Sequence, residues 1–226
     1  MIRRPPRSTL DRSSAASDVY KRQPHYIVSN EASREPILGY HLTHNFSCRT
    51  YFRKNLKGNR MAVMPILWAP DPVLKTKCTQ VSEIDDNILS LMEDMLETMY
   101  QANGIGLAAT QVDKHIRLVV MDLSEERNDP RIFVNPEYEI LEGYEMFEFE
   151  EGCLSIPGFN ETIARPDKIK LIWQNLSGET MEDTPEGILT VCIQHEIDHL
   201  DGKLMVDYVS ALKRDRIRNK LLKDFR

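Results

Sequence analysis

Residues 194–202 have the sequence QHEIDHLDG, in which His195, Glu196 and His199 form the pattern HExxH. In a helix, positions i and i+4 project from one face about one turn apart, so both imidazoles can bind one metal ion. Glu196 then lies beside that metal, where a carboxylate can accept a proton from water. The alternative is a chance match on a helix with two partly buried histidines. Taken alone, these nine residues predict a two-ligand metal site and leave its chemistry open.

A catalytic metal site of this kind needs a third protein ligand, since three ligands leave one coordination position for water or substrate. Cys153 is one candidate, because it follows a predicted strand and the adjacent Gly152 allows close approach of the backbone. Cys192 is the rival, one turn before His195, but its apolar neighbours favour a packed core thiol. We favour Cys153 as the ligand. The other two cysteines are interpreted as free thiols: Cys48 and Cys78.

Residues 104–111, GIGLAATQ, form a third unusual segment. Its small residues would let a substrate backbone lie alongside, and Gln111 ends it with an amide side chain. A Gly-rich stretch after a helix is more commonly only a C-cap and loop. A phosphate-binding loop is excluded, because no strand precedes the glycines, no helix follows them and no Lys comes after them.

Three helices are predicted. The helix that carries HExxH should begin at Thr184-Pro185, an N-cap and N1 pair, and end at Gly202. A long amphipathic helix should run from a capping box at residues 82–85 to Gly104. A third, basic helix is predicted over residues 209–224. The apolar residues that recur at helical spacing in the long helix are Ile84, Ile88, Leu91, Met92, Met95 and Met99.

Between the long amphipathic helix and the HExxH helix, short β-rich runs are predicted at residues 116–121, 131–134, 138–149 and 168–173. Turn residues such as Asn128-Asp129-Pro130 separate them, which favours antiparallel sheets over βαβ units. Helix, strands, helix and helix in this order indicate an α+β domain.

The composition is that of an ordinary globular protein with one substantial core, since 41% of the 226 residues are apolar and 28% are charged. No stretch approaches the roughly 20 consecutive apolar residues of a membrane span, and the N-terminus lacks the apolar core of a secretory signal. The four cysteines are widely spaced, without a CxxC pair, which argues against a disulfide framework. We therefore expect an intracellular protein.

Charge is distributed unevenly along the chain. The 12 Lys/Arg and 4 Asp/Glu of residues 1–60 give +8, the 7 and 2 of residues 211–226 give +5, and the total of −6 leaves −19 for residues 61–210. Residues 1–60 begin with a Pro/Arg/Ser-rich run and show no sustained periodicity. We expect them to be a disordered or non-native extension, either a transit peptide or translated adapter sequence, with Met61 or Met64 as the natural start.

Together, GIGLAATQ at 104–111, EGCLS at 151–155 and QHEIDHLDG at 194–202 resemble, in order, the three signature motifs of the peptide deformylase family. The resemblance covers residues from about 61 to 222, and EGCLS looks like the bacterial and organellar class. It implies antiparallel β-sheets packed around a central HExxH helix, in a catalytic domain over residues 61–226. It also implies a mononuclear hydrolase, natively with Fe²⁺, that removes the N-formyl group from the initiator methionine of nascent polypeptides. Zn²⁺, Ni²⁺ or Co²⁺ would substitute for iron.

Residue roles follow from the resemblance by motif position. It implies that the metal ligands are Cys153, His195 and His199. Glu196 would be the general acid/base, and the Gln111 side chain and the Leu154 backbone N–H would form the oxyanion hole. Ile105 and Gly106 would line the path of the substrate main chain and methionine side chain. Helical spacing, not the resemblance, places Ile188, Val191 and Cys192 on the stripe of His195, where they would line the methionine pocket or be plain core. Arg165 is expected either to anchor a structural carboxylate or to line the substrate cleft.

Two other functions remain open on the sequence. A zinc metalloprotease shares the HExxH helix, but such enzymes usually take a third Glu or His ligand from downstream, where residues 200–210 offer neither. A metal-stabilised binding module could use the basic C-terminal helix, whose cationic surface could contact ribosomal RNA. The expected partners are formylmethionyl peptides and the ribosome, with no membrane and no DNA. The expected location is cytoplasmic, or organellar if residues 1–60 are a transit peptide.

Overall fold

The structure, a computed structural model, describes residues 62–224, so the extension predicted for residues 1–60 lies outside the described part. In chain order the elements are η1 (Pro72–Lys75), α3 (Asp86–Gln101), β1 (Gly106–Ala108), η2 (Ala109–Val112), β2 (Leu118–Met121), β3 (Arg131–Ile140), β4 (Met146–Gly152), β5 (Asn160–Pro166), β6 (Ile169–Gln174), β7 (Thr180–Asp183), α4 (Ile188–Leu200), η3 (Met205–Asp207) and α5 (Ala211–Asp224). The predicted α+β class is confirmed.

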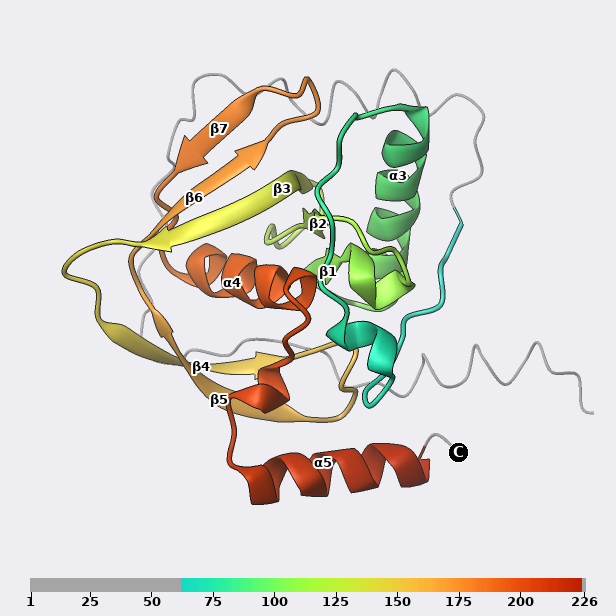
Figure 1. The fold of residues 1–226 in the computed structure, drawn as a ribbon, viewed down its shortest axis with the longest axis vertical. Coiled ribbons are helices and arrows are strands. Elements are labelled where there is room, and N and C mark those ends of the chain that lie inside the picture. Colours follow the sequence, from blue (N-terminus) through green and yellow to red (C-terminus); the bar gives the residue numbers. More distant parts are fainter. Residues whose placement is uncertain (1–61, 225–226) are drawn as a thin grey trace, which may run out of the picture.

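The larger of the two sheets is covered by a helix on each face. Its strand order is β1-β2-β3-β6-β7, and every neighbouring pair is antiparallel. Side chains alternate between the faces of a strand, so Leu118 and Val120 of β2 pack with α3, whereas Val119 and Met121 pack with α4. All four residues of β2 are therefore buried. Figure 1 shows α3 and α4 in these positions.

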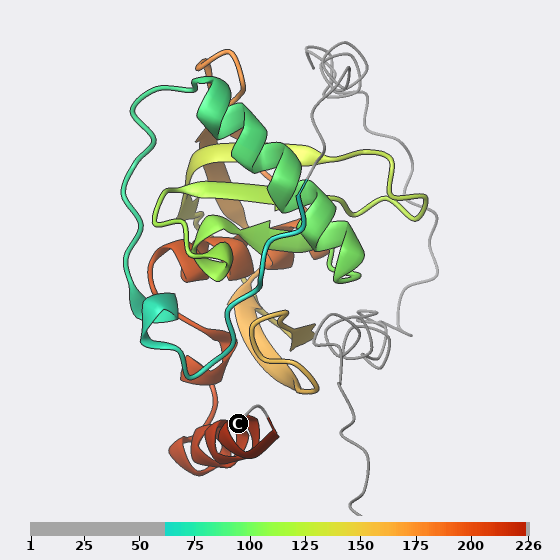
Figure 2. The ribbon, with the colours of Figure 1, turned by 90° about the vertical axis from the view of Figure 1, so that its right-hand side faces the viewer.

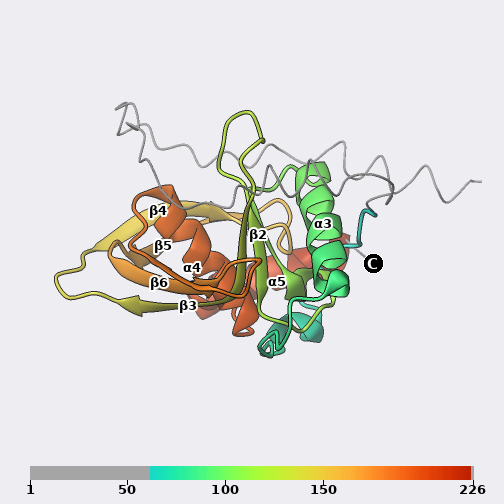
Figure 3. The same cartoon turned by 90° about the horizontal axis from the view of Figure 1, so that it is seen from above.

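Helix α4 lies between the two sheets, with β4 and β5 forming a two-stranded antiparallel sheet on its other side (Figures 1 and 3). Every residue from Thr190 to Leu200 is buried as a result. A helix buried all round is normally apolar. Helix α4 instead places Gln194, His195, Glu196, Asp198 and His199 in the interior, and each of these polar groups needs a partner there.

The first helix begins later than predicted. The N-cap is Asp85, whose side chain accepts a hydrogen bond from the Ile88 N–H at 2.9 Å. Ile84 precedes the cap, and both Ile84 and Leu89 pack against the same apolar cluster, as in a hydrophobic staple. The predicted capping box at residues 82–85 is wrong, because Ser82 lies outside the helix. The helix ends at Gln101, three residues before Gly104.

Other boundaries also differ from the predictions. Helix α4 has Gly187 as its N-cap, so Thr184-Pro185 lies in the connection before it. The predicted run 138–149 contains the end of β3, a turn and the start of β4. Three strands were missed: β1, β5 and β7. Their sequences are short or polar, so that their pairing depends on neighbours far away in the chain.

Helix α5 contacts η3, and its buried residues belong to the apolar cluster that contains Cys153. Figure 2 shows this helix, in red, at the bottom of the molecule. Its buried residues are Ile217 and Leu221. Lys213 pairs with the buried carboxylate of Glu161 on β5. The predicted basic helix is therefore present, from residue 211. No helix within residues 62–224 is long and apolar enough to cross a membrane.

Candidate metal centre

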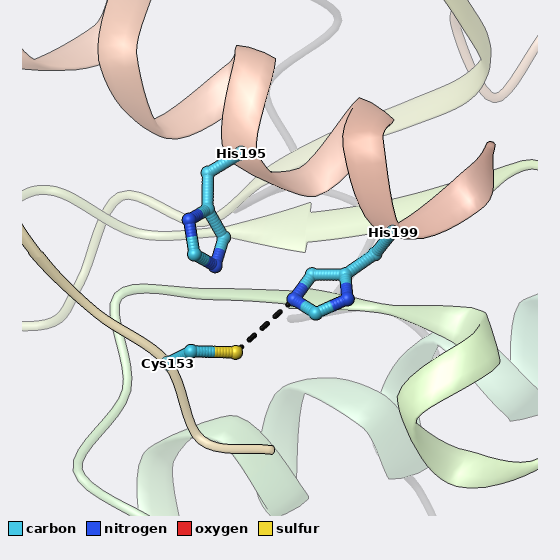
Figure 4. Close-up of side chains that lie close together, drawn as sticks. All are labelled: Cys153, His195 and His199. Atoms are coloured by element: carbon cyan, nitrogen blue, oxygen red, sulfur yellow. Dashed lines mark hydrogen bonds between the residues drawn. The ribbon is translucent and has the colours of Figure 1, made fainter. Parts of the chain in front are cut away.

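Cys153, His195 and His199 point toward one another in the interior (Figure 4). One candidate ligand atom from each lies within 4.8 Å of the others, and Cys153 Sγ is 3.2 Å from His199 Nε2. The histidines lie on successive turns of α4 with ring centroids 5.0 Å apart, while Cys153 directly follows β4. Within the described residues no group that could hold a metal includes Cys192.

A carboxylate fixes the orientation of the His195 ring. Nδ1 of His195 is 2.8 Å from Glu151 Oε2, which leaves Nε2 as the ring nitrogen for a metal. Burial lowers the pKa of His195, but hydrogen bonds with Cys153 and Glu151 outweigh it and raise that pKa well above its usual value. Burial lowers the pKa of His199 well below its usual value, and the positive charge of His195 adds to this effect.

The carboxylate of Glu196 lies against the backbone of Gly106. A Cβ atom at position 106 would clash with the Glu196 Oε1 atom and lie 3.0 Å from the Cδ atom of Glu196. Oε2 of Glu196 is buried and has no hydrogen-bond partner among residues 62–224. Burial raises the pKa of Glu196 to about 7, although the charges of His195 and Arg165 oppose the shift. A carboxyl group with such a pKa can both accept and return a proton near neutral pH.

The side-chain amide of Gln111 is held in one orientation. Its Oε1 accepts a hydrogen bond from the Ala108 N–H at 2.8 Å, which assigns Nε2 to the opposite side. Nε2 donates to Ser155 Oγ at 3.1 Å and lies 3.9 Å from Cys153 Sγ. The donor end of this amide therefore faces the cysteine.

One pocket collects most of the residues that the sequence singled out. The predicted residues that line it are Ile105, Gly106, Gln111, Cys153, Leu154, Ile188, Val191, Cys192, His195 and Glu196. They come from the segment after α3, from the end of β4 and from α4, which are far apart in the chain. Gly104 and Glu150 to Gly152 complete the lining.

Arg165 does not line this pocket. Its side chain is 3% exposed, and its guanidinium donates to Glu151 and to Asp198. Of the two alternatives for Arg165, these contacts favour the one in which it anchors structural carboxylates over the one in which it lines the substrate cleft. Burial lowers the pKa of Arg165, but these carboxylates outweigh it and raise the pKa above its usual value.

Sequence reasoning missed the residues that surround the candidate ligands. Glu151 and Asp198 were quoted only as letters of EGCLS and HEIDH, and Tyr208 was not singled out. Tyr208 donates a hydrogen bond to Asp198 Oδ2 at 2.8 Å. A signal was available, because a charged residue inside a motif that is expected to be buried needs a partner of opposite charge.

Comparison with known proteins identifies the family. A family model described as polypeptide deformylase matches residues 63–215. The chain belongs to the peptide deformylase family. A peptide deformylase of Azotobacter vinelandii is 56% identical over 166 residues, which cover 74% of this chain and 98% of the relative. One of Pseudomonas aeruginosa is 55% identical over 166 residues, with the same coverage.

Solved peptide deformylase structures share the fold. A crystal structure from Legionella pneumophila has a TM-score of 0.67 and 42% identity, covering 72% of this chain and 95% of that one. A structure from Ehrlichia chaffeensis in complex with actinonin has a TM-score of 0.69 and 37% identity. The match covers 74% of this chain and 99% of that one. The chain is accordingly a hydrolase, as the sequence predicted.

The peptide deformylase family is metal-dependent, and the donor set of this chain fits a metal ion. One thiol and two imidazoles converge in a buried site, and His195 has its second ring nitrogen already engaged. Sulfur and imidazole ligands suit zinc, iron, nickel and cobalt better than magnesium or calcium. Three protein ligands also leave a position for substrate or water.

Proposed function

We propose that this chain removes the N-formyl group from formylmethionyl peptides, using a metal ion held by Cys153, His195 and His199. The observation that carries the proposal is the convergence of these three side chains at a pocket that Cys153, His195 and Glu196 line. Bound metal would supply a Lewis acid that polarises the formyl group and lowers the pKa of water. The products would be formate and a free amino terminus.

Glu196 is proposed to move the proton. Its buried carboxylate would accept a proton from the attacking water and then return it to the nitrogen of the leaving amine. The formyl oxygen gains negative charge as water adds, and the Gln111 Nε2 amide and the Leu154 N–H are proposed to donate hydrogen bonds to it. The Ala108 contact supports the Gln111 role, since it keeps the donor end of the amide turned to the site.

The apolar wall of the pocket is proposed to receive the methionine side chain. Ile188, Val191 and Cys192 form one stripe of α4 on the N-terminal side of His195, and Ile105 lines the same pocket. Gly106 brings the backbone of β1 close to Glu196. An unbranched apolar side chain would bury well in such a slot.

The proposal is tested by the bond that is cleaved. We expect formate release from formyl-Met-Ala and no cleavage of internal peptide bonds in an unformylated peptide of the same length. The metalloprotease alternative predicts the reverse. Residues 200–210 contain no Glu or His, and the third candidate ligand comes from upstream, which supports the deformylase. Cleavage of internal bonds alone would contradict the proposal.

We propose Fe²⁺ as the native metal, with Zn²⁺, Ni²⁺ or Co²⁺ able to replace it. The thiol of Cys153 makes the ligand set softer than three imidazoles would be, and it lowers the formal charge of a divalent site by one. Metal analysis of protein purified without oxygen tests this assignment. One equivalent of iron per chain is expected, and stoichiometric zinc with no iron would contradict it.

Helix α5 is proposed to contact the ribosome. Lys213 is already paired with Glu161, and Lys220 lies over the Phe159 ring. Arg214 Nη1 also lies 3.9 Å from Asp207 Oδ1. The cations left for RNA are therefore fewer than the sequence suggested, and are chiefly Arg216, Arg218 and Lys223. Replacing Arg216 and Arg218 by Glu should abolish salt-sensitive co-sedimentation with ribosomes and leave turnover of formyl-Met-Ala unchanged. Unchanged ribosome binding would contradict the proposal.

We propose residues 61–226 as the catalytic domain, in a cytoplasmic enzyme. The 166 aligned residues of the Azotobacter vinelandii relative cover nearly all of that protein and support this boundary. Expression of residues 61–226 alone should give the same formate release as the full chain. Mass spectrometry of the N-terminus tests whether residues 1–60 belong to the mature protein.

A further inference from the structure

Arg165 connects the two parts of the chain that carry the candidate metal ligands. Its Nε and Nη2 atoms donate to Glu151 at 2.5 and 2.9 Å, and Nη1 donates to Asp198 at 2.8 Å. Glu151 stands two residues before Cys153 on the chain, and Asp198 directly precedes His199 on α4. A single guanidinium is thus bonded to both segments.

Glu151 also reaches His195. Its Oε2 atom accepts from Arg165 and lies 2.8 Å from His195 Nδ1. Carboxylates that contact the outer nitrogen of a ligand histidine set the ring orientation and the tautomer. The carboxylate can do this only if its own position is fixed. Arg165 fixes it through two hydrogen bonds in the fork geometry that only a guanidinium offers.

Tyr208 holds the other side of the guanidinium. Its hydroxyl donates to Asp198 Oδ2 at 2.8 Å, and the Arg165 Cζ atom lies 5.2 Å from the centre of its ring. Arg165 is thus enclosed by Glu151, Asp198 and an aromatic face. If it were removed, the only cationic partners left among residues 62–224 would be the more distant Lys203 for Asp198, at 3.8 Å, and His195 for Glu151. The loss of the guanidinium from two buried carboxylates is strongly unfavourable. Strand β4 and helix α4 would then tend to move apart.

We propose that Arg165 is a positioning residue that holds Cys153 and the two histidines at metal-binding separation before the metal binds. The inference rests on the ligand set proposed above. Arg165 is not expected to touch either the substrate or the metal. Its contribution is to metal affinity and coordination geometry, because it links the segment that bears the thiol to the helix that bears the imidazoles.

The test compares Arg165→Lys with Arg117→Lys. Lys keeps the positive charge of Arg165 but cannot bond two carboxylates in the same geometry. Arg117 is a matched control, since it is also buried and bonds Asp201 at 2.7 Å and the Pro136 carbonyl at 2.7 Å without touching a candidate ligand or Glu151. We expect Zn²⁺ affinity, measured by competition with a chelator, to fall about 10–100-fold in Arg165→Lys. Arg117→Lys should change it less than threefold.

Coordination geometry gives a second measurement. The visible absorption of Co²⁺-loaded protein should shift in Arg165→Lys and stay as in the parent in Arg117→Lys. If Arg165→Lys fails to fold, Tyr208→Phe replaces it, because this change removes only the hydroxyl donor to Asp198. A smaller loss of Zn²⁺ affinity, about threefold to tenfold, is then expected.

The outcomes separate this inference from the proposed ligand set. Parent protein that binds no stoichiometric Zn²⁺ would overturn both. Parent protein that binds one equivalent, with the Zn²⁺ affinity and the Co²⁺ spectrum unchanged in Arg165→Lys, would overturn only the role of Arg165. Equal loss of Zn²⁺ affinity in Arg165→Lys and Arg117→Lys would also overturn it, because the effect would then be a general loss of stability.

Discussion

Glu196 is buried, but one of its carboxylate oxygens, Oε2, has no hydrogen-bond partner among residues 62–224. The pKa of Glu196 is raised to about 7 because the carboxylate is buried. Leaving a buried polar atom unpaired costs free energy, which a protein tolerates where that atom has a function. Glu196 adjoins the candidate ligand His195 but is not itself one of the grouped ligands. Proton transfer and metal binding should therefore be separable by mutation.

Glu196→Gln should abolish most of the activity and leave the metal in place. Gln has nearly the same shape but cannot accept and return a proton, so kcat for formate release should fall about 10²–10⁴-fold. Metal content, measured on the same sample, should stay at one equivalent. Full activity in Glu196→Gln would show that another group carries the proton.

Gly106→Ala should reduce activity through the position of Glu196. The added Cβ would clash with Glu196 Oε1, and β1 is held by its pairing with β2, so the carboxylate must move. We expect at least a tenfold loss of kcat, in line with general acid/base catalysis that depends on geometry, with metal content unchanged.

Gly143→Ala is the control for this change. Gly143 has φ +71 and no neighbour within 4 Å of an added Cβ, so the substitution should cost about 1–2 kcal/mol of stability and leave kcat unaltered. An activity of Gly106→Ala equal to the parent's would mean that Glu196 does not depend on this contact.

At the scale of elements, α4 is held in place at its C-terminal end. Its last turn leads into Gly202, which has φ +73 and lies so close to the backbone of Lys75 that an added Cβ would be 2.8 Å from the carbonyl carbon. The turn after α4 is thereby packed against the 3-10 helix η1. This contact fixes the end of the helix nearest to His199.

Gly202→Ala should destabilise the fold more than Gly178→Ala. Both residues have positive φ, but an added Cβ at Gly178 meets nothing within 4 Å. Gly178→Ala should therefore cost only the conformational strain of about 1–2 kcal/mol, or roughly 2–8 °C in Tm for a domain of this size. Gly202→Ala must also displace the Lys75 backbone and should lower Tm further. Equal Tm values for the two variants, measured at the same metal loading, would contradict the close approach of Gly202 to the Lys75 backbone.

At the scale of the molecule, the site forms where the end of one sheet meets the helix that both sheets cover. Cys153 belongs to the apolar cluster that includes Ile217 and Leu221 of α5, whereas Ile193 and Ile197 of α4 belong to the cluster under the larger sheet. A metal ion bound by Cys153 and α4 would join these two clusters. Metal binding should therefore stabilise the whole domain.

Removal of the metal should lower Tm. A ligand at about 1,000 times its Kd stabilises the folded state by about 4 kcal/mol, which corresponds to on the order of 10 °C for a domain of this size. Stripping with a chelator and adding Zn²⁺ back, followed by thermal unfolding, measures the effect. Cys153→Ser should lose most of this metal-dependent shift and Cys192→Ser should keep it. The opposite result would make Cys192 the ligand.

Some elements were predictable because their signal is local. The spacing of Ile88, Met92, Met95 and Met99 follows the turn of a helix, and α3 contains all four. Strand β5 was missed for a physical reason: its buried positions include Glu161 and Arg165 beside Ile163. Charged residues at buried positions do not produce the apolar alternation that marks a strand, since their burial depends on Lys213 and Glu151, which lie elsewhere in the chain.

The sequence by itself determined the α+β class, the family and the placement of His195 and His199 on one face of a helix. Those features depend on helical periodicity and on motifs that are continuous in the chain. The sequence favoured Cys153 over Cys192, but only the tertiary structure brings the Cys153 thiol beside the histidines and shows Arg165 bonded to both Glu151 and Asp198. The reason is that these contacts join β4, β5 and α4, whose charges acquire partners only when the sheets close around the helix.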